Sequence, residues 1–450
     1  MSASTLVSTA LHTDRYELTM LGAALRDGTA ARRCVFELFG RRLPGGRRFG
    51  VVAGTGRLLT LLREFRFGDD ELRYLKDQKV VDAATLTYLE NYRFTGSIVG
   101  YREGEVYFPG SPIMTVEGTF AEAVVLETLA LSVLNHDSAI ATAAARMSIA
   151  AGDRPLAEMG SRRAGEESAV AAARAAYIAG FAATSNLEAG RRWGVPTMGT
   201  AAHAWTLLHD SEEDAFRSQI DALGAGTTLL VDTYDIRQGV ETAVRVAGTS
   251  LGGVRIDSGD LPTVAASVRA QLDDLGATKT KITVTSDLDE FAIASLAASP
   301  IDSYGVGTSL VTGSGTPTAG MVYKLVARQD STGAWVSVAK ASTDKGSKGG
   351  RKAAFRSLRD GTATHELVSV SDGFEQLSAA AQHPEARALQ IPFVTSGDFD
   401  SSAEGSTGVE SARSHHAFVR DELPVRSLAL SRSDPAIPTV YVDATEQRAT

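Results

Sequence analysis

The chain has little of several features that mark particular classes of protein. Among its 450 residues is one cysteine, Cys34, which excludes an internal disulfide and a thiolate metal cluster. It lacks an uninterrupted apolar run of about 18 residues, which argues against a membrane span. It also lacks a Walker A motif and a GxGxxG dinucleotide fingerprint. A phosphate ligand is therefore not expected in an ordinary P-loop.

An excess of positive charge is also missing. Lys and Arg total 45 against 54 Asp and Glu, a net charge of -9. This balance disfavours nucleic acid as the main partner but is compatible with a local basic pocket for a small anion. The N-terminal segment lacks the basic-then-apolar order of a secretory signal peptide. We expect a soluble cytoplasmic protein that binds neither nucleic acid nor membrane.

Hydrophobic residues make up 43% of the chain and charged residues 22%, so there is enough apolar material for a large buried core. Between residues 154 and 307, short β-rich runs alternate with Ala-rich segments of helical period. This alternation predicts repeated βα units around a parallel sheet, and so an α/β fold. The predicted strands are 154–160, 195–199, 227–234, 252–259, 281–287 and 302–307. The predicted helices are 166–183, 212–223, 236–247, 261–276 and 288–298.

The two ends of the chain have different patterns. Residues 1–135 carry predicted helices at 14–27 and 54–65 and β-rich runs at 33–39 and 94–117, which indicates a separate α+β domain, followed by a long helical connection over 120–150. After residue 326 the chain becomes rich in Ser, Gly and Lys, and then helical and loop-like. We therefore expect an N-terminal domain (1–135), a central α/β domain (136–325) and a smaller C-terminal region (326–450) with at least one mobile loop.

Nearly every predicted central strand ends in a polar or glycine-containing cluster: GSRR, GTAAH, DTYD, RIDSGD, TSD and GVGTS. Turn chemistry alone explains any single cluster. Six in succession favour an active site, because the carboxyl ends of the strands of a β/α barrel converge on one face.

Two of these clusters have the chemistry of a phosphate site. Gly305, Gly307 and Thr308 follow a predicted strand and offer backbone N–H groups and a hydroxyl to a phosphate. Ser286 and Asp287 end the preceding strand. The GxGT pattern alone is common, so an ordinary structural turn is an open alternative there.

Carboxylates concentrate at the same strand ends: Asp232, Asp235, Asp257, Asp260 and Asp287. Such a cluster suits Mg²⁺, ribose hydroxyls or a cationic transition state. Helix capping is the alternative, and we expect it of Asp260 or Asp287.

Basic groups and a histidine complete the set. Arg162, Arg163 and Arg255 offer forks for carboxylate or phosphate, and strand alternation points Arg255 and Asp257 the same way. A structural salt bridge is an equal alternative for Arg255. His203 suits a general base or a phosphoryl-accepting nucleophile, although a lone histidine is more often structural.

These clusters, in this order, resemble those of the nicotinate phosphoribosyltransferases, a family of type II phosphoribosyltransferases. The order and spacing of the strings make the resemblance specific over most of residues 13–310. The matching strings are TDRYELTM (13–20), LNHDSAIATAAARM (134–147), EMGSRRA (158–164), GFAATSN (180–186), GTAAHAW (199–205), VDTYD (231–235), RIDSGDL (255–261), TSDLDE (285–290) and YGVGTSL (304–310).

The resemblance implies a reaction in which nicotinate and phosphoribosyl pyrophosphate give nicotinate mononucleotide and pyrophosphate, the entry of free nicotinate into NAD. It also implies coupling to ATP hydrolysis, a requirement for Mg²⁺ and a homodimer with shared active sites. The implied fold is an N-terminal α+β domain packed on an irregular α/β barrel.

The resemblance also implies roles for individual residues. His203 matches the histidine that ATP phosphorylates, while Arg255 and Asp257 match residues that hold the substrate phosphate and ribose. Tyr16 matches an aromatic residue that stacks on the pyridine ring. The implied phosphate cradle comprises Ser286, Asp287, Gly305, Gly307 and Thr308. The remaining implied substrate contacts are Gly160, Ser161, Arg162, Arg163, Thr200, Asp232 and Asp235, with Asp232 and Asp257 as the Mg²⁺ ligands.

The sequence departs from the family pattern at Met159, where many relatives have Phe, and at Ala143, where a basic residue is frequent. Three alternatives stay open: a nicotinamide phosphoribosyltransferase, a quinolinate phosphoribosyltransferase without ATP coupling, and a non-catalytic relative that binds phosphometabolites. His203, Arg255 and the acidic cluster argue against the last, because a binder would not need them all.

Overall fold

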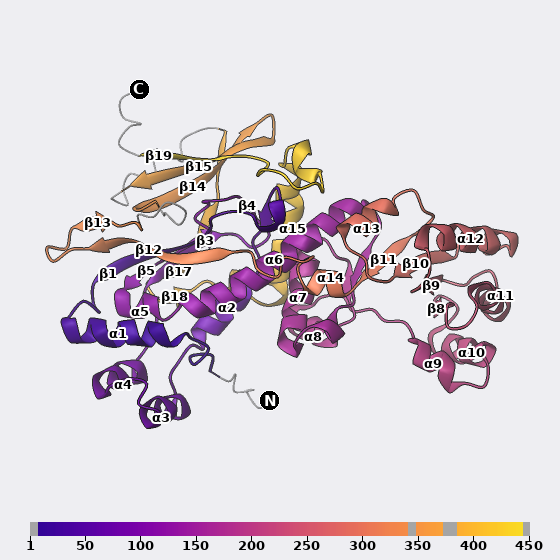
Figure 1. Ribbon diagram of the computed structural model, residues 1–450, viewed down its shortest axis with the longest axis horizontal. Coiled ribbons are helices and arrows are strands. Elements are labelled where there is room, and N and C mark those ends of the chain that lie inside the picture. Colours follow the sequence, from indigo (N-terminus) through magenta and orange to yellow (C-terminus); the bar gives the residue numbers. More distant parts are fainter. Residues whose placement is uncertain (1–7, 341–347, 372–384, 444–450) are drawn as a thin grey trace. The chain divides into compact units, whose positions relative to one another are not determined.

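The structure is a computed structural model that describes residues 8–340, 348–371 and 385–443. The chain divides into two units. Figure 1 shows the ribbon coloured by residue number, from indigo at the N-terminus to yellow at the C-terminus. The first unit combines Met1–Thr142 with Thr318–Thr450, and the second is Ala143–Pro317.

The first unit is built on a seven-stranded sheet in the order β13-β12-β1-β5-β3-β17-β18, in which all neighbours are antiparallel. One of its inner strands, β1, is buried along nearly its whole length because both faces of the sheet are covered. The strands are β1 (Arg33–Gly40), β3 (Ser97–Tyr101), β5 (Met114–Thr119), β12 (Met321–Gln329), β13 (Trp335–Ser337), β17 (Gln390–Thr395) and β18 (Asp398–Phe399).

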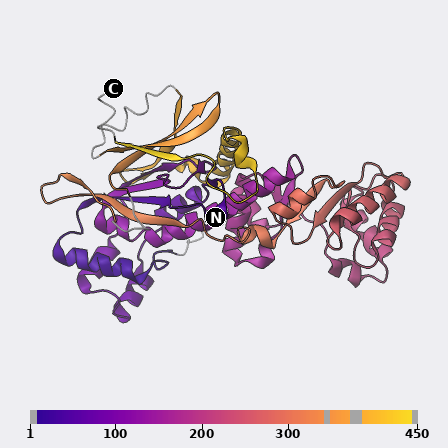
Figure 2. The same ribbon diagram turned by 45° about the horizontal axis from the view of Figure 1, so that its top comes forward.

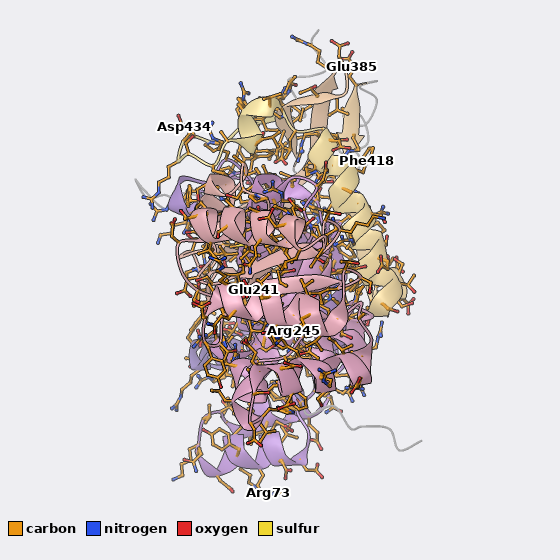
Figure 3. The ribbon with its side chains drawn as sticks, turned by 90° about the vertical axis from the view of Figure 1, so that its right-hand side faces the viewer. Arg73, Glu241, Arg245, Glu385, Phe418 and Asp434 are labelled. Atoms are coloured by element: carbon orange, nitrogen blue, oxygen red, sulfur yellow. The ribbon has the colours of Figure 1, made fainter. Side chains whose placement is uncertain are left out.

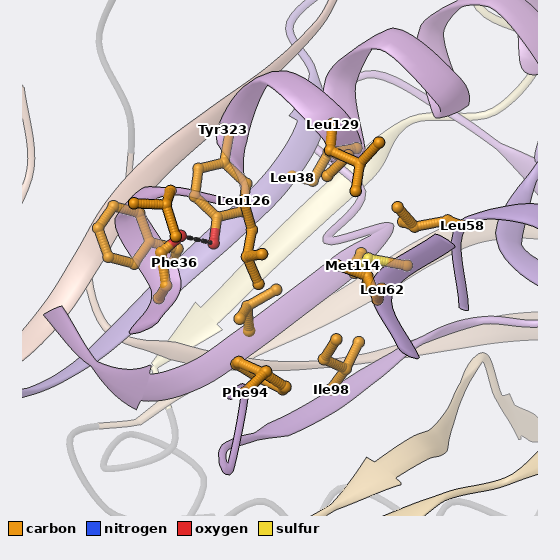
Figure 4. Packing of buried hydrophobic residues seen from close by; sticks show 14 of the residues in the cluster. Phe36, Leu38, Leu58, Leu62, Phe94, Ile98, Met114, Leu126, Leu129 and Tyr323 are labelled. Atoms are coloured by element: carbon orange, nitrogen blue, oxygen red, sulfur yellow. Dashed lines mark hydrogen bonds between the residues drawn. The ribbon is translucent and has the colours of Figure 1, made fainter. Parts of the chain in front are cut away.

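The main core of this unit lies between the sheet and its helices. Figure 4 shows Phe36 and Leu38 of β1 packed with side chains of the neighbouring strands and of helices α2 and α6. Burying one such side chain contributes about 1.5–3 kcal/mol. The hydroxyl of Tyr323 donates to the carbonyl of Ala123 at 3.0 Å, so the aromatic ring is buried without an unpaired polar atom. The helices are α1 (Arg15–Asp27), α2 (Thr55–Arg63), α3 (Asp69–Asp77), α4 (Ala83–Glu90), α5 (Phe120–Val124) and α6 (Glu127–Ala151).

A four-stranded sheet in the order β16-β14-β15-β19 and the helix α15 complete the first unit, with a short pair β2-β4. A buried ion pair stabilises this part: the guanidinium of Arg356 lies 2.8 Å from the carboxylate of Glu366, and both side chains are fully buried. The elements are β2 (Gly50–Val51), β4 (Val106–Tyr107), β14 (Arg351–Arg359), β15 (Thr362–Ser371), β16 (Ala386–Ala388), β19 (Thr439–Asp443) and α15 (Gly405–Asp421).

The C-terminal region differs from the expected separate, helical and loop-like region. Its strands β12 and β17 pair with β1 and β3, so it shares a unit with the N-terminal residues. The acidic, Ser-rich segment 396–413 lies largely in β18, a short 3-10 turn and α15. Antiparallel pairing over such a separation is invisible in a local window of sequence. Residues 341–347, within the Lys- and Gly-rich segment, lie outside the described residues.

The second unit has a six-stranded parallel sheet in the order β7-β6-β11-β10-β9-β8, a half-barrel. This confirms the predicted α/β fold class. Figures 1 and 2 show α10, α11 and α12 along one side of the strands β8–β10. The strands are β6 (Leu156–Glu158), β7 (Ala183–Thr184), β8 (Thr228–Leu230), β9 (Gly253–Ile256), β10 (Lys281–Thr285) and β11 (Ser303–Val306). The helices are α7 (Glu166–Ile178), α8 (Leu187–Trp193), α9 (His203–Leu208), α10 (Glu212–Leu223), α11 (Ile236–Ala247), α12 (Leu261–Asp274), α13 (Glu290–Ser295) and α14 (Thr308–Val311).

The helices of this sheet are amphipathic, as their sequence period predicts. On α11, Val240 and Val244 are buried, while Glu241 and Arg245 are exposed on the outer surface in Figure 3. Arg245 lies 2.9 Å from Glu213 of α10. The observed bounds of α10 and α11 match the predicted 212–223 and 236–247.

The predicted strand 195–199 is wrong. That segment makes one isolated bridge, between its Thr197 and Thr184 of β7. The strand that pairs with β6 is the two-residue β7 and not this segment. The backbone of Thr184 bonds to the carbonyl of Pro196 and to the N–H of Met198. Proline has no N–H to donate, which limits longer pairing.

Two further expectations concern properties of the chain as a whole. Cys34 is a free, buried thiol on β1, and burial raises its pKa to about 11. Over the described ranges, every helix is too short or too polar to cross a membrane.

A buried histidine makes the stability of the first unit dependent on pH. The Nδ1 atom of His416 lies 2.9 Å from the carbonyl of Gly104, and burial outweighs this hydrogen bond and lowers the pKa of His416 to about 4. Free histidine has a pKa near 6.5, so the unfolded chain binds this proton more tightly. The histidine therefore lowers stability as the pH falls from about 6.5 to 4, by an amount on the order of 3 kcal/mol.

The substitution His416→Asn keeps a donor near the Nδ1 position but does not titrate in this range. We predict that urea denaturation between pH 7 and about 4 gives a flatter stability profile for this variant than for the wild type. His12→Asn, at an exposed histidine of the same unit, is the control and leaves the profile unchanged. Equal slopes for the His416→Asn variant and the wild type would contradict the prediction.

Candidate active site

A pocket of about 270 Å³ opens at the carboxyl ends of β6, β9, β10 and β11 in the second unit. Parallel strands present these ends at one edge of the sheet, which is why residues from four separate segments meet there. It contains most of the predicted site residues, together with Met159 and Thr285. Its lining residues are Met159, Arg162, Arg163, Arg255, Asp257, Thr285, Ser286, Asp287, Gly305, Gly307 and Thr308.

Thr285, which ends β10, connects the basic and acidic groups of the pocket. Its hydroxyl oxygen accepts a hydrogen bond from Nε of Arg255 at 3.1 Å and donates to Oδ1 of Asp257. The guanidinium of Arg255 lies 3.9 Å from that same carboxylate. Arg255 and Asp257 therefore point the same way, as strand alternation predicts. Thr285 was missed as a site residue, although it opens the matching string TSDLDE.

Arg255 is held from a second direction. One of its terminal nitrogens donates to the hydroxyl of Thr200 at 2.8 Å, which links the predicted residue Thr200 to the pocket. The side chain of Arg255 is mostly buried. Two threonine hydroxyls thus fix the guanidinium while part of it faces the pocket.

The glycines of GVGTS leave space for this arrangement. A Cβ added to Gly305 would lie 2.5 Å from the methyl group of Thr285 and 2.7 Å from the sulfur of Met159. Gly307 follows β11 directly and precedes Thr308, the first residue of α14. A side chain at position 305 would therefore occupy the space beside Thr285, and glycine keeps it clear.

His203 lies beside Asp232, whose side chain contacts the loop at Asp257. The Nδ1 atom of His203 lies 3.1 Å from the hydroxyl of Thr233, and its Nε2 atom lies 3.9 Å from Oδ1 of Asp232. Oδ2 of Asp232 accepts from the N–H of Asp257 at 2.8 Å and from the hydroxyl of Ser258 at 2.7 Å. The side chain of His203 is 41% exposed, so its ring is accessible and not a core residue.

The predicted capping roles are wrong in detail. Asp260 is the N-cap residue of α12 but makes no side-chain cap bond, and Asp287 caps no described helix. Asp235 instead caps α11 by accepting from the N–H of Gln238 at 2.9 Å, and Asp289 caps α13. Burial, aided by the charge of Asp235, raises the pKa of Glu212 to about 7.

The GSRR segment forms a 3-10 turn, Ser161–Arg163, at the edge of the pocket. Ser161 accepts a hydrogen bond from the side-chain amide of Asn186 at 2.9 Å, and Gly160 precedes the turn. The side chains of Arg162 and Arg163 are exposed, and neither forms an ion pair with a described residue. Both guanidinium groups are therefore available to an anionic ligand.

Tyr16 belongs to the first unit, so its predicted contact with the ring of a substrate stays a prediction. It lies on α1 with 46% of its surface exposed. Partial burial, together with the nearby carboxylate of Glu127, raises the pKa of Tyr16 to about 12. Its hydroxyl is therefore protonated at neutral pH, and its ring is accessible.

Two carboxylates of the second unit have a chemistry that fits Mg²⁺. The side chain of Asp232 is 1% exposed, and its Oδ1 atom has no hydrogen-bond partner among the described residues. Asp257 lines the pocket. The described part of the chain contains no group of three or more metal-binding side chains. Mg²⁺ commonly uses only one or two carboxylates and completes its shell with waters and substrate phosphates, so two carboxylates are compatible with this ion.

Comparison with known families gives two adjoining matches. Residues 11–135 match the N-terminal domain of nicotinate phosphoribosyltransferase, and residues 155–371 match the nicotinate phosphoribosyltransferase family. The chain belongs to the nicotinate phosphoribosyltransferase family. The family resemblance of the sequence strings is confirmed.

Individual members of this family are similar over nearly the whole chain. Nicotinate phosphoribosyltransferase pncB1 of Mycobacterium tuberculosis is 56% identical over 443 residues, which cover 96% of this chain and 95% of the relative. The nicotinate phosphoribosyltransferase of Bacillus subtilis is 41% identical over 360 residues, covering 78% and 73%. The crystal structure of human nicotinic acid phosphoribosyltransferase has a TM-score of 0.78 at 26% identity and covers 96% of this chain and 97% of that one.

The close packing around Gly305 predicts a loss of stability in the variant Gly305→Ala. The added methyl group would push against Thr285, which lacks a flexible end that can move away. We expect a loss of about 1–3 kcal/mol, the usual effect of overpacking. The matched control is Gly226→Ala, where a Cβ meets nothing within 4 Å. Urea denaturation measures both, and equal stabilities would contradict the described packing.

Proposed function

We propose that this chain catalyses the ATP-coupled transfer of phosphoribosyl from phosphoribosyl pyrophosphate to nicotinate, giving nicotinate mononucleotide and pyrophosphate. Such a reaction brings free nicotinate into NAD biosynthesis. Family membership supports the reaction, and the single observation that carries it is the composition of the pocket. Two exposed arginines, a glycine-rich strand end and the Arg255–Thr285–Asp257 group line one cavity.

The pocket offers one group of residues for each part of the donor substrate. The backbone and hydroxyls of Ser286, Gly305, Gly307 and Thr308, with Asp287 alongside, would hold the 5′-phosphate. Arg255, fixed by two threonines, would hold a further phosphate group. Asp257 would stabilise the positive charge that develops on the ribose as its bond to pyrophosphate breaks.

The turn after β6, which lies beside the end of β11, suits nicotinate. A guanidinium from Arg162 or Arg163 would pair with its carboxylate, and Gly160 and Ser161 would shape the base site. Met159 would contact the pyridine ring through its thioether. Tyr16 would stack on that ring. We also propose a cytoplasmic homodimer with shared active sites, in which Tyr16 acts on the neighbouring subunit's pocket, as the family resemblance implies.

Mg²⁺ and ATP belong to the same proposal. Asp232 and Asp257 would hold Mg²⁺, which neutralises charge on the pyrophosphate leaving group when bound. Asp235, although it caps α11, would contribute its carboxylate to the same acidic edge. His203 would accept the terminal phosphoryl group of ATP. Its exposed ring, oriented by Thr233 and close to Asp232, supports that role.

The availability of Arg162 and Arg163 predicts selectivity for a carboxylate. A charge-assisted hydrogen bond contributes about 1.5–3 kcal/mol, so nicotinate should exceed nicotinamide in kcat/KM by about tenfold or more. Product formation by the purified chain is measured with nicotinate, nicotinamide and quinolinate, with and without ATP. In the double variant R162A/R163A this preference should disappear. A wild type that used both bases equally, or preferred quinolinate without ATP, would contradict the proposal.

The role of His203 predicts that the His203→Ala protein folds but loses nicotinate-dependent ATP hydrolysis. A slower ATP-independent transfer should persist, because Arg255 and Asp257 still orient the substrates. Wild-type protein should take up acid-labile, base-stable label from γ-labelled ATP, as a phosphohistidine does. The control is His209→Ala, at the C-cap of α9, where Nδ1 lies 2.8 Å from the carbonyl of Trp205 and the ring packs against the Trp205 ring. A folded His203→Ala protein that still coupled ATP hydrolysis to product would exclude this residue.

A further inference from the structure

We propose that Glu158 is a positioning residue of the base site: it fixes the Ser161–Arg163 turn and so the direction of Arg162 and Arg163. The inference rests on the proposed function, because it assigns those arginines to the nicotinate carboxylate. Glu158 ends β6 and does not line the pocket itself.

The carboxylate of Glu158 is shared between two loops. Its Oε1 atom accepts the N–H of Gly160, which opens the GSRR turn, and its Oε2 atom accepts the hydroxyl of Thr184 at the end of β7. The residue is 0% exposed and forms no ion pair with a described residue. Both of its oxygens are therefore committed to holding neighbouring backbone and side chain.

These contacts close into a ring of hydrogen bonds. The oxygen of Thr184 accepts the N–H of Asn186 at 2.9 Å, and the side-chain amide of Asn186 donates to the hydroxyl of Ser161 at 2.9 Å. Ser161 follows Gly160, which returns the ring to Glu158. A backbone bond from Ser185 to the carbonyl of Glu158, at 2.8 Å, adds a further connection between the two strand ends. The GSRR turn is thus held at two successive residues.

The position of Glu158 is costly without such a role. Burial raises the pKa of Glu158, and the hydrogen bonds from Thr184 and Gly160 only partly oppose it. Burying a carboxyl group is costly unless it is hydrogen-bonded, so the bonds from Gly160 and Thr184 are what allow Glu158 to be buried here. The turn also lacks free space: a Cβ on Gly160 would clash with Val311 and approach the carbonyl of Gly307 to 3.1 Å.

A shift of the Ser161–Arg163 turn should affect the binding of one substrate, nicotinate. If the turn shifts, both guanidinium groups shift with it, and a displacement of about 1 Å is enough to weaken an oriented contact strongly. The residues proposed for the phosphates lie on or directly after β9, β10 and β11 and do not belong to the ring of hydrogen bonds. Loss of Glu158 should therefore affect nicotinate more than phosphoribosyl pyrophosphate.

The test compares Glu158→Gln, Glu158→Leu and Thr184→Val in the full chain. Glutamine keeps an acceptor for Gly160 and a donor for Thr184, whereas leucine keeps only volume. Thr280→Val is the matched control: Thr280 is fully buried near the start of β10, and its hydroxyl makes one bond, to the carbonyl of Leu251 at 2.9 Å. For each protein the KM of both substrates, kcat, the nicotinate-to-nicotinamide ratio and Tm are measured.

We expect Glu158→Gln to retain kcat/KM for nicotinate within about threefold and Glu158→Leu to raise the KM for nicotinate about tenfold or more. The KM for phosphoribosyl pyrophosphate should change less than about threefold, and Thr280→Val should change only Tm. Thr184→Val should raise the nicotinate KM and lower the nicotinate-to-nicotinamide ratio. If the Glu158→Leu variant does not fold, the Thr184→Val variant tests the positioning role in its place.

Folded Glu158→Leu or Thr184→Val proteins with an unchanged nicotinate KM would overturn the assignment. Equal rises in the KM of both substrates would also overturn it, because they indicate a general structural role. In either case an active wild type leaves the proposed function intact. A wild type without transfer to nicotinate would overturn the proposed function, and the role of Glu158 with it.

Discussion

The parallel alignment of the six strands in the second unit is the constraint on which the site depends. Each βα unit must return to the same edge of the sheet before its next strand begins, so all strands end at one edge. Segments as far apart in sequence as Arg162 and Thr308 therefore line one pocket. The chemistry of the pocket is distributed over many short strings, none of which forms a site by itself.

In and beside that pocket, some polar groups are fixed by hydrogen bonds, and others are exposed and unpaired among the described residues. Arg255 and Asp257 are held through Thr285, and Asp232 is held by the loop after β9. The guanidinium groups of Arg162 and Arg163, by contrast, are exposed. Fixed groups suit a transition state, because they need no reorganisation as charge develops. Exposed guanidinium groups suit a substrate that carries a negative charge. In the proposed arrangement, buried Glu158 and half-buried Thr200 would set where the functional side chains point.

The sequence predicts the local part of this structure well. The period of apolar residues gives the bounds of α10 and α11, and strand alternation correctly orients Arg255 with Asp257. These features depend on neighbours within a few residues. The order of polar strand ends also predicts which segments meet, because parallel strands leave few other arrangements. His203, Asp232 and Thr200 are connected to one another or to pocket residues by side-chain contacts that no spacing rule predicts.

What depends on distant partners could not be predicted. The segment 195–199 has the composition of a strand, yet β7 occupies the position beside β6. The C-terminal strands pair with strands near the N-terminus, a choice that no local pattern reveals. Both Asp235 and Asp260 are N-cap residues, yet only the side chain of Asp235 makes a cap bond, a difference that the local sequence does not reveal. Tyr16 lies in the first unit and the pocket lies in the second, so no local sequence pattern connects Tyr16 with the pocket.

The most direct test of the central claim is a crystal structure of the protein with nicotinate mononucleotide bound. The 5′-phosphate should bind at Ser286, Gly305 and Gly307, the ribose beside Asp257, and the pyridine carboxylate on Arg162 or Arg163. A nucleotide bound in the reverse direction, or outside the pocket at the carboxyl ends of β6, β9, β10 and β11, would contradict this arrangement.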